Sequence, residues 1–305
     1  MSDDQPNLSD GSVELRAHDP AETGAHSFDV ERAGEPVGVV AVRVLDEGTG
    51  RLSWRLDPRH RGRGNGVRAV RLLTDWALTE AGQGGLGLSR VEALVPSDDD
   101  ASLRLASRSG LLREGLSRIA PGSGERSATT GYVVSARLAT DPPLSDPSTF
   151  RTLLNSFLPR KRAIGQMLIR DTAGRVLLCQ LTYKRDWDLP GGVVEVGESP
   201  RLATSRELTE ELGLEIEAGP LVLTDWLPPW GGWDDAVCLV FDGGVHDPGL
   251  LDGIVKQERE IVSAEFLTLA EVHERAADFT ARRIEAALAA LDGRGPAYTE
   301  SGRGA

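Results

Sequence analysis

Three glutamates, Glu207, Glu210 and Glu211, stand at spacings i, i+3 and i+4 and would share one face of a helix. Carboxylates that close together repel one another and destabilise a helix unless cations compensate. Hard oxygen ligands in this arrangement suit Mg²⁺ or Mn²⁺, which prefer carboxylates, waters and phosphate oxygens. The segment therefore predicts a divalent-metal site, and the alternative is a solvated acidic helix face.

The residues around the glutamates supply the helix that would present them. Ser199 predicts an N-cap and Pro200 fits the first helical position, so a helix is expected to begin there. Gly213 predicts its end. The side chains expected to face a core are Leu202, Leu208 and Leu212.

Fixed positions upstream favour the metal site over the solvated face. The turn Pro190-Gly191-Gly192 would let backbone carbonyls approach the same ions, because glycine carries no side chain. Arg206 can pair with Glu198 or Glu210 and hold the acidic groups in register. Glutamates accompanied by glycines and an arginine at set spacings indicate a functional motif.

The segment from Gly192 to Leu214 resembles the Nudix signature, Gly-x5-Glu-x7-Arg-Glu-aliphatic-x-Glu-Glu-x-Gly-aliphatic, and matches every fixed position. The approach Trp187-Asp188-Leu189-Pro190-Gly191-Gly192 is also similar to that family, and the resemblance extends over about residues 159–291. It implies an α/β/α sandwich around a mixed sheet. It also implies hydrolysis of a nucleoside diphosphate linked to another group.

The same resemblance assigns roles by position. Glu207 and Glu211 would be metal ligands, and Glu210 would share the metals or help to activate water. One more acidic residue often comes from outside the motif in this family, and the candidates are Glu258 and Glu260, which could also be surface charges. The remaining assigned positions are Glu198 and Arg206 as supporting residues and Gly192 as the donor of a backbone carbonyl to a metal.

Three tryptophans follow within eight residues, Trp226, Trp230 and Trp233. They could stack on a base or a nicotinamide ring, or they could form and cover part of the core. Pro229, fifteen residues beyond Leu214, resembles a proline of ADP-ribose-hydrolysing members. These features favour an ADP-ribose-like or other small nucleotide diphosphate as substrate and leave the linked group open.

A second candidate site lies in the first half of the chain, where a strand expected over Leu52 to Leu56 is followed by a glycine-rich turn and a helix expected over Asn65 to Ala81. Free backbone N–H groups and the positive end of the helix dipole would face a phosphate there. The alternative is a tight basic loop. The turn consists of Arg61, Gly62, Arg63, Gly64, Asn65 and Gly66.

The stretch from Gly38 to Arg118 resembles the GNAT acetyltransferase family, in particular the branch that acetylates protein N-termini. The turn matches that family's Arg/Gln-x-x-Gly-x-Gly/Ala cradle for the pyrophosphate of acetyl-CoA, and Ser102 would protonate the leaving thiolate. The chain departs from the pattern at Asp99, where the family has asparagine. Too few residues separate Leu15 from Phe28 for the two usual acceptor-side helices, so the domain is expected to be shortened.

These elements predict an α/β (α+β) protein with a GNAT-like mixed-sheet domain, shortened, followed by a Nudix α/β/α sandwich. Three prolines and two serines mark a linker between them. The expected division is a GNAT-like domain at 12–139, a linker at 140–149, a Nudix domain at 150–292 and a disordered tail at 293–305.

Composition limits the partners. The 305 residues carry a net charge of −13, so polymeric DNA or RNA is an unexpected partner. Cys179 and Cys238 lie in apolar runs and are expected to be buried and reduced, and two cysteines exclude a disulfide framework. No signal peptide and no membrane-spanning run is recognisable, which predicts a cytoplasmic protein.

Three hypotheses about function remain open. The leading one is a Mg²⁺-dependent hydrolase with an appended domain that binds acetyl-CoA. The second is a bifunctional acetyltransferase and hydrolase. The third is a regulatory protein that senses ligands without turnover, which three mutually repelling glutamates disfavour for the second half of the chain.

Overall fold

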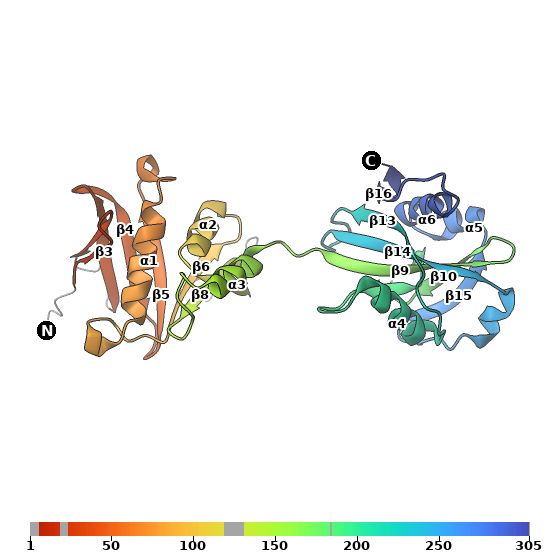
Figure 1. The fold of residues 1–305 in the computed structure, drawn as a ribbon, viewed down its shortest axis with the longest axis horizontal. Coiled ribbons are helices and arrows are strands. Elements are labelled where there is room, and N and C mark those ends of the chain that lie inside the picture. Colours follow the sequence, from red (N-terminus) through yellow and green to blue (C-terminus); the bar gives the residue numbers. More distant parts are fainter. Residues whose placement is uncertain (1–5, 19–23, 119–130, 184, 305) are drawn as a thin grey trace. The chain divides into compact units, whose positions relative to one another are not determined.

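A computed structural model describes residues 6–18, 24–118, 131–183 and 185–304 of the chain. The chain divides into two compact units, residues 1–159 and 160–305 (Figure 1). Within the described ranges, no helix is long and apolar enough to span a membrane. Both cysteines are free and buried, as expected.

The first unit is built on a mixed sheet with the strand order β1-β2-β3-β4-β5-β6-β8-β7 among the described residues. A single core lies under helix α1 (Asn65–Leu78), whose Val70, Leu73 and Ala77 are fully buried at helical spacing. A second helix, α2 (Asp100–Arg108), precedes β7. The strands are β1 (Leu8–Ser9), β2 (Glu14–His18), β3 (Ala25–Arg32), β4 (Glu35–Val44), β5 (Thr49–Leu56), β6 (Arg90–Pro96), β7 (Leu112–Ser117) and β8 (Tyr132–Leu138).

Two features of this sheet bear on function. Strands β5 and β6 are parallel neighbours, but their ladder joins only Thr49–Arg51 to Arg90–Glu92, so the rest of β5 runs without β6 beside it. Strands β2 and β3 pair directly, with only residues 19–24 between them. That connection is too short for two helices, which fits the shortened domain expected from the sequence.

The second unit is an α/β/α sandwich. Its mixed sheet has the order β11-β10-β9-β14-β13-β16-β17, with β12 beside β9 and β15 beside β10. Helix α4 (Pro200–Leu212) covers one face, and α5 (Leu269–Arg275) and α6 (Asp278–Leu291) cover the other (Figure 1). The strands are β9 (Arg162–Asp171), β10 (Val176–Leu181), β11 (Trp187–Asp188), β12 (Gly191–Val193), β13 (Leu221–Leu227), β14 (Ala236–His246), β15 (Ile261–Leu267), β16 (Tyr298–Glu300) and β17 (Arg303–Gly304).

Strand β9 shows why helices must cover both faces of this sheet. Met167 and Ile169 belong to the core under α4, whereas Leu168 belongs to the core under α6. Successive strand residues point to opposite faces, so a strand that is apolar at each of these positions must be buried on both sides.

The boundary between the units differs from the expected one. Helix α3 (Pro147–Phe157) crosses the end of the expected linker 140–149 and the expected domain start at 150. Asp146 caps this helix, and Arg113 of β7 donates its backbone N–H to the Ser156 hydroxyl at 3.2 Å. The segment therefore packs with the first unit, which also begins earlier than residue 12, at β1.

The expected disordered tail at 293–305 contains strands instead. Strand β16 pairs in parallel with β13, and β17 pairs with β16. The cause is a buried anchor: Asp225 on β13 accepts hydrogen bonds from the Thr299 hydroxyl and the Gly302 backbone N–H, both at 2.8 Å. The prediction of disorder rested on the glycine-rich composition of this segment, which gives no indication of the contact with Asp225.

Candidate active site

A glycine loop brings the backbone of β12 against helix α4. Gly191 has φ +136°, and a Cβ there would overlap the carbonyl oxygen of Gly165 on β9. A Cβ on Gly192 would overlap the carboxyl group of Glu207, lying 2.7 Å from both of its oxygens. Only glycine permits this approach of the loop to the acidic helix face.

Helix α4 begins and ends where the sequence predicts. The Ser199 hydroxyl caps it by accepting from the Leu202 backbone N–H, and Gly213 ends it in the left-handed conformation. Leu208 and Leu212 are fully buried, but the expectation for Leu202 is wrong, because that side chain is 65% exposed. One turn from the N-terminus, Ala203 takes the buried position instead.

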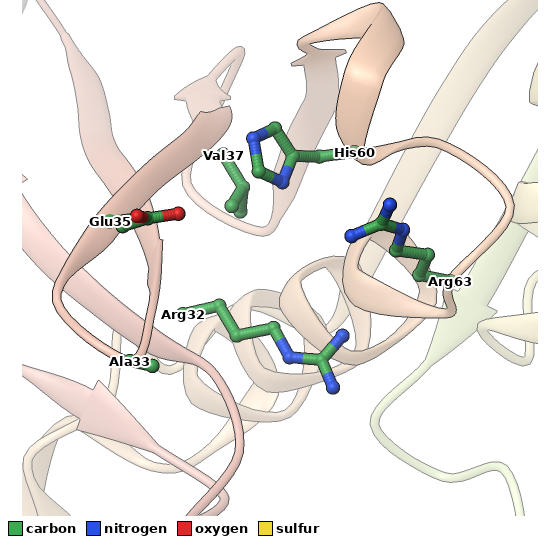
Figure 2. Close-up of a pocket in the computed structure, with 6 residues that line it drawn as sticks. All are labelled: Arg32, Ala33, Glu35, Val37, His60 and Arg63. Carbon is green, nitrogen blue, oxygen red and sulfur yellow. The ribbon is translucent and has the colours of Figure 1, made fainter.

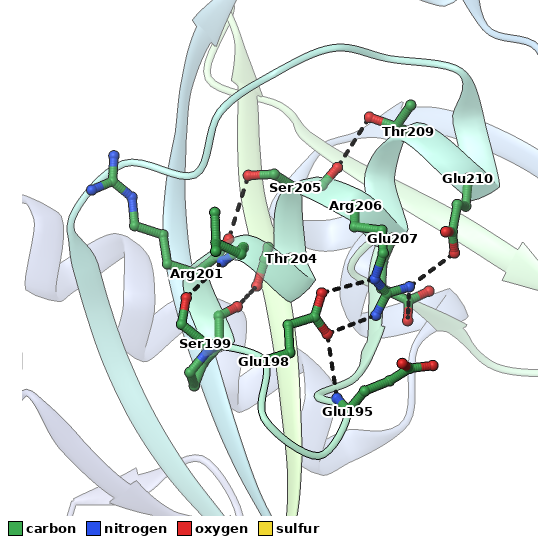
Figure 3. Close-up of polar contacts among 12 residues, drawn as sticks. Glu195, Glu198, Ser199, Arg201, Thr204, Ser205, Arg206, Glu207, Thr209 and Glu210 are labelled. Carbon is green, nitrogen blue, oxygen red and sulfur yellow. Dashed lines mark hydrogen bonds and ion pairs between the residues drawn. The ribbon is translucent and has the colours of Figure 1, made fainter.

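Arg206 organises three of the predicted acidic residues (Figure 3). Its guanidinium donates two hydrogen bonds to Glu198, at 2.9 and 3.0 Å. Its Nη1 donates one bond each to Glu207, at 3.1 Å, and Glu210, at 2.9 Å. The paired arginine lowers the pKa of Glu198, which is consequently held as a carboxylate.

Glu211 stands apart from that group. Its side chain is buried, and its Oε2 accepts a hydrogen bond from the Gly191 backbone N–H at 3.1 Å. Burial, followed by the charges of Glu207, Glu260 and Asp188, raises the pKa of Glu211 to about 7. A buried carboxyl group with this surplus of negative neighbours is a position that a cation would stabilise.

Of the two acidic candidates outside the motif, Glu260 is the one whose charge raises the pKa of Glu207 and Glu211. The pKa of Glu207 is raised by burial first and also by the charges of Glu210 and Glu260. Glu260 immediately precedes β15, and its backbone carbonyl accepts from the Thr182 N–H at 2.9 Å. The sheet thus fixes its place next to α4.

Across the described ranges, no three His, Cys, Asp or Glu side chains are drawn together closely enough to hold a metal ion. Arg206 turns Glu207 and Glu210 toward itself, while Glu211 turns toward the glycine loop. The donor set still fits a divalent cation, because its side chains offer hard carboxylate oxygens and, in the part of the chain that the structure describes, Arg206 is the one cation paired with them. The glycine loop also leaves no side chain between its backbone and Glu207.

A cavity of about 350 Å³ adjoins the glycine loop, with Gly191 and Gly192 in its wall. Trp230 and Trp233, which are about half exposed, line it together with Phe279 of α6. The predicted third tryptophan, Trp226, lies on β13 and is half-buried outside this wall. Sequence reasoning missed three polar wall residues, because they are far apart in the chain: Gln166, Arg282 and Arg283.

In the first unit, a cavity of about 430 Å³ lies where β5 runs without β6. Gly62 and Gly64 have φ +75° and +81°, and Gly64 stands at the N-cap of α1 with no side-chain cap. Most of the predicted turn lines this cavity, together with Ser102. The turn residues in its wall are Arg61, Gly62, Gly64, Asn65 and Gly66.

Arg63 is the exception in the predicted turn. It faces a separate surface cavity of about 530 Å³, together with Arg32 and His60 (Figure 2). Asn65 is buried and serves the turn itself, accepting from Arg32 Nη1 at 3.1 Å and donating to the His60 carbonyl at 3.4 Å.

The predicted departure at Asp99 has a local explanation. Asp99 caps α2 by accepting from the Ser102 backbone N–H at 3.0 Å, and this bond, with further hydrogen bonds, lowers the pKa of Asp99. The Ser102 hydroxyl accepts a bond from Trp54 Nε1 at 3.3 Å. Asp99 and Ser102 both lie in the wall of the 430 Å³ cavity, and their hydrogen bonds also hold α2 and β5 in place.

Comparisons with known proteins agree with this division. The NUDIX domain model matches residues 159–288, and the Acetyltransferase (GNAT) domain model matches residues 6–112. A MutT-like protein from Streptomyces ambofaciens is 31% identical over 169 residues, which covers 54% of this chain and 89% of that protein. An RNA pyrophosphohydrolase from Roseobacter denitrificans is 41% identical over 78 residues, 23% of this chain and 46% of that protein, so the chain spans about half of its length.

Solved structures are similar to each half. The MutT protein from Methanosarcina mazei Go1 is 23% identical with a TM-score of 0.37, covering 42% of this chain and 94% of that one. A GNAT-family acetyltransferase from Bacillus anthracis is 20% identical with a TM-score of 0.33, covering 38% of this chain and 67% of that one.

Proposed function

The chain belongs to the NUDIX family and is a hydrolase of diphosphate bonds, joined to a GNAT domain; from this premise we propose that it cleaves, with Mg²⁺ or Mn²⁺, a nucleoside diphosphate linked to another group. The observation that carries the metal requirement is Glu211. This buried carboxyl lies beside Glu207 and the Gly191–Gly192 loop with a surplus of negative charge.

We assign the metal to Glu207 and Glu211, with the Gly192 carbonyl and Glu210 as further donors. A bound Mg²⁺ or Mn²⁺ would neutralise charge on the diphosphate and lower the pKa of a bound water. Arg206 keeps its two bonds to Glu198 and gives up its single Nη1 bonds, which frees the other carboxylates. The proposal thus gives Glu198 and Arg206 a positioning role.

Glu210 suits the proton transfer in this scheme. It is the most exposed member of the group around Arg206, so it can reach water that the buried Glu211 cannot. Water oxygen attacks one phosphorus, the bond from that phosphorus to the bridging oxygen breaks, and the leaving phosphate takes the electron pair. The carboxylate accepts the proton of the attacking water.

The test is a panel of nucleoside diphosphates linked to sugars, nucleosides or phosphates, incubated with the full chain and Mg²⁺, Mn²⁺ or EDTA. We expect metal-dependent release of a nucleoside monophosphate and a phosphorylated partner for at least one class. Failure to cleave any member in any metal would contradict the proposal and favour a ligand-sensing role.

We also propose that the first unit binds acetyl-CoA at its glycine turn. The support is the cavity of about 430 Å³ beside the uncapped start of α1, where backbone N–H groups and Arg61 would meet a pyrophosphate. Calorimetry with acetyl-CoA is expected to show saturable binding, and its absence would overturn this assignment. Repeating the titration with an amine acceptor would reveal transfer, which the bifunctional hypothesis requires.

A further inference from the structure

The cavity of about 530 Å³ in the first unit lies beside the turn between β3 and β4, and we call it the hairpin cavity (Figure 2). Volumes between about 300 and 1,000 Å³ are typical of small-molecule sites. Its wall consists of Arg32, Ala33, Glu35, Val37, His60 and Arg63. The hairpin cavity is distinct from the 430 Å³ cavity assigned to acetyl-CoA, because of these six residues only His60 lines both.

Short-range structure forms this wall. The turn at 33–34 has φ angles of +51° and +79°, as in a tight two-residue hairpin, so Arg32 and Glu35 are register partners where β3 ends and β4 begins. Val37 is buried, and its backbone carbonyl accepts from the Asp57 N–H at 3.0 Å, which ties the following loop to β4. The wall therefore exists before a ligand arrives, which lowers the cost of binding.

The wall carries two arginines that have no ionic partner. Arg32 and Arg63 are exposed, and neither forms an ion pair with any residue that the structure describes. Arg59, in the same loop as Arg63, is by contrast paired with Asp57 at 2.9 Å. Residues 51–71 contain seven arginines and one acidic residue, although the whole chain has a net charge of −13. This part of the surface therefore attracts anions that the rest of the molecule repels.

Arg32 is held in place by the glycine turn. Its Nη1 donates to Asn65 Oδ1 at 3.1 Å, and this buried asparagine also donates to the His60 carbonyl at 3.4 Å. Within the described ranges, that bond is the one hydrogen bond of the Arg32 side chain, so its other N–H groups remain for a ligand. A guanidinium group held in this way is suited to phosphate oxygens, which it binds in pairs.

Glu35 marks the other end of the hairpin cavity. Figure 2 shows its carboxylate across the cavity from the guanidinium groups of Arg32 and Arg63. Glu35 forms no ion pair with either of them, or with any other residue in the described part of the chain. An ionised carboxylate only accepts hydrogen bonds, so it suits the hydroxyl groups of a ligand and repels a second anionic group.

We propose that the hairpin cavity binds a sugar phosphate, with the phosphate on Arg32 and Arg63 and the hydroxyl groups toward Glu35. A phosphate monoester has three terminal oxygens, enough for two guanidinium groups, whereas a carboxylate has two. Inorganic phosphate alone would leave Glu35 without a donor. The inference goes beyond the proposed function, because it requires neither hydrolysis nor acetyl transfer.

Ribose 5-phosphate, inorganic phosphate and ribose test the two ends of the cavity. Binding to the full chain is measured by calorimetry in EDTA, which keeps metal from the second unit, with and without acetyl-CoA. We expect saturable binding of ribose 5-phosphate in both conditions, binding of inorganic phosphate about tenfold weaker, and none of ribose. No binding of ribose 5-phosphate, its displacement by acetyl-CoA, or equal affinity for inorganic phosphate would overturn the proposal.

Variants locate the binding. Arg63→Gln removes an exposed side chain that makes no hydrogen bond or ion pair with the described residues, so the fold should persist while affinity for ribose 5-phosphate falls about tenfold or more. Arg59→Gln is the matched control, because it removes the same charge from the same loop outside the wall, and affinity should stay within about threefold. Equal losses in the two variants would contradict a site at Arg63.

Glu35→Ala tests the hydroxyl end. The exposed carboxylate is removed, so the preference for ribose 5-phosphate over inorganic phosphate should fall from about tenfold to less than about threefold. Affinity for inorganic phosphate itself should not fall, because Glu35 repels it. An unchanged preference would overturn the orientation of the ligand.

Discussion

The two units use glycine next to a helix in opposite ways. In the second unit, Gly191 and Gly192 are required because a side chain would overlap the Gly165 carbonyl or the Glu207 carboxyl group. In the first unit, Gly62 and Gly64 are required by positive φ angles, and a Cβ there would meet nothing within 4 Å. One loop is closed against acidic side chains, and the other is open toward a cavity.

This difference separates two kinds of chemistry. A closed loop over carboxylates holds donors for a small cation, where ångström-scale placement matters. An open turn at an uncapped helix start presents N–H groups to a large anion and tolerates changes in side chains. We therefore expect a glycine-to-alanine substitution in the loop of the NUDIX unit to lower its turnover strongly. A substitution of the same kind in the turn of the GNAT unit should lower acetyl-CoA binding much less.

Gly192→Ala would test the closed side most severely. Its Cβ must displace the Glu207 carboxyl group, and misplacing a metal ligand by about 1 Å is expected to lower turnover about 100-fold. The measurement is the initial rate of hydrolysis at saturating Mg²⁺. Gly253→Ala, where a Cβ meets nothing within 4 Å, is the matched control and should retain activity.

Glu211→Gln, in the same unit, should make the folded chain more stable although it removes a proposed metal ligand. The pKa of Glu211 is raised to about 7, mainly by burial, so ionisation destabilises the folded chain as pH rises through that value. Without metal, the free energy of unfolding of the glutamine variant relative to that of wild type should rise by on the order of 2–3 kcal/mol between pH 5 and pH 8. Urea unfolding in EDTA measures this, and a gap that does not change with pH would contradict it.

Thr299→Val tests the anchor of the last strands. The Thr299 hydroxyl donates to buried Asp225, and removing it is expected to cost about 1–3 kcal/mol of unfolding free energy in the second unit. Urea unfolding of the full chain is the measurement. An unchanged free energy of unfolding would contradict the anchor and favour the disordered tail that the composition predicts.

Gly66→Ala tests the open side. The added Cβ would lie 2.5 Å from Leu56 and 2.7 Å from Leu105, and these side-chain ends would shift into the cavity. We expect acetyl-CoA affinity to fall about tenfold, with stability changed by less than about 1 kcal/mol, because alanine favours the helix. Gly82→Ala, with nothing within 4 Å of its Cβ, should bind as wild type does.

Local chemistry explains how much could be predicted. Ser199, Pro200 and Gly213 fix the ends of α4 by capping rules that act within a few residues, so the sequence predicts that helix. The bond between Asp225 and Arg283 joins residues 58 positions apart, and no local pattern announces it. The same applies to Thr299, whose partner lies 74 positions away.

Two further differences have the same origin. Leu202 was expected in the core from its apolar type, but the width of the buried face of α4 is set by the sheet that it covers, and Leu202 lies beyond it. The predicted linker extended to residue 149, but helix α3 begins at Pro147 and packs against β7. Composition alone does not indicate this contact.

We propose that the second unit hydrolyses a diphosphate through a metal held by Glu207 and Glu211. The most direct test is the Mg²⁺ dependence of turnover for wild type, Glu211→Gln and the control Glu215→Gln, whose side chain is exposed. We expect Mg²⁺-dependent cleavage by wild type and the control, and a turnover rate about 100-fold or more lower in Glu211→Gln. Unchanged turnover with the same Mg²⁺ dependence in Glu211→Gln would contradict it.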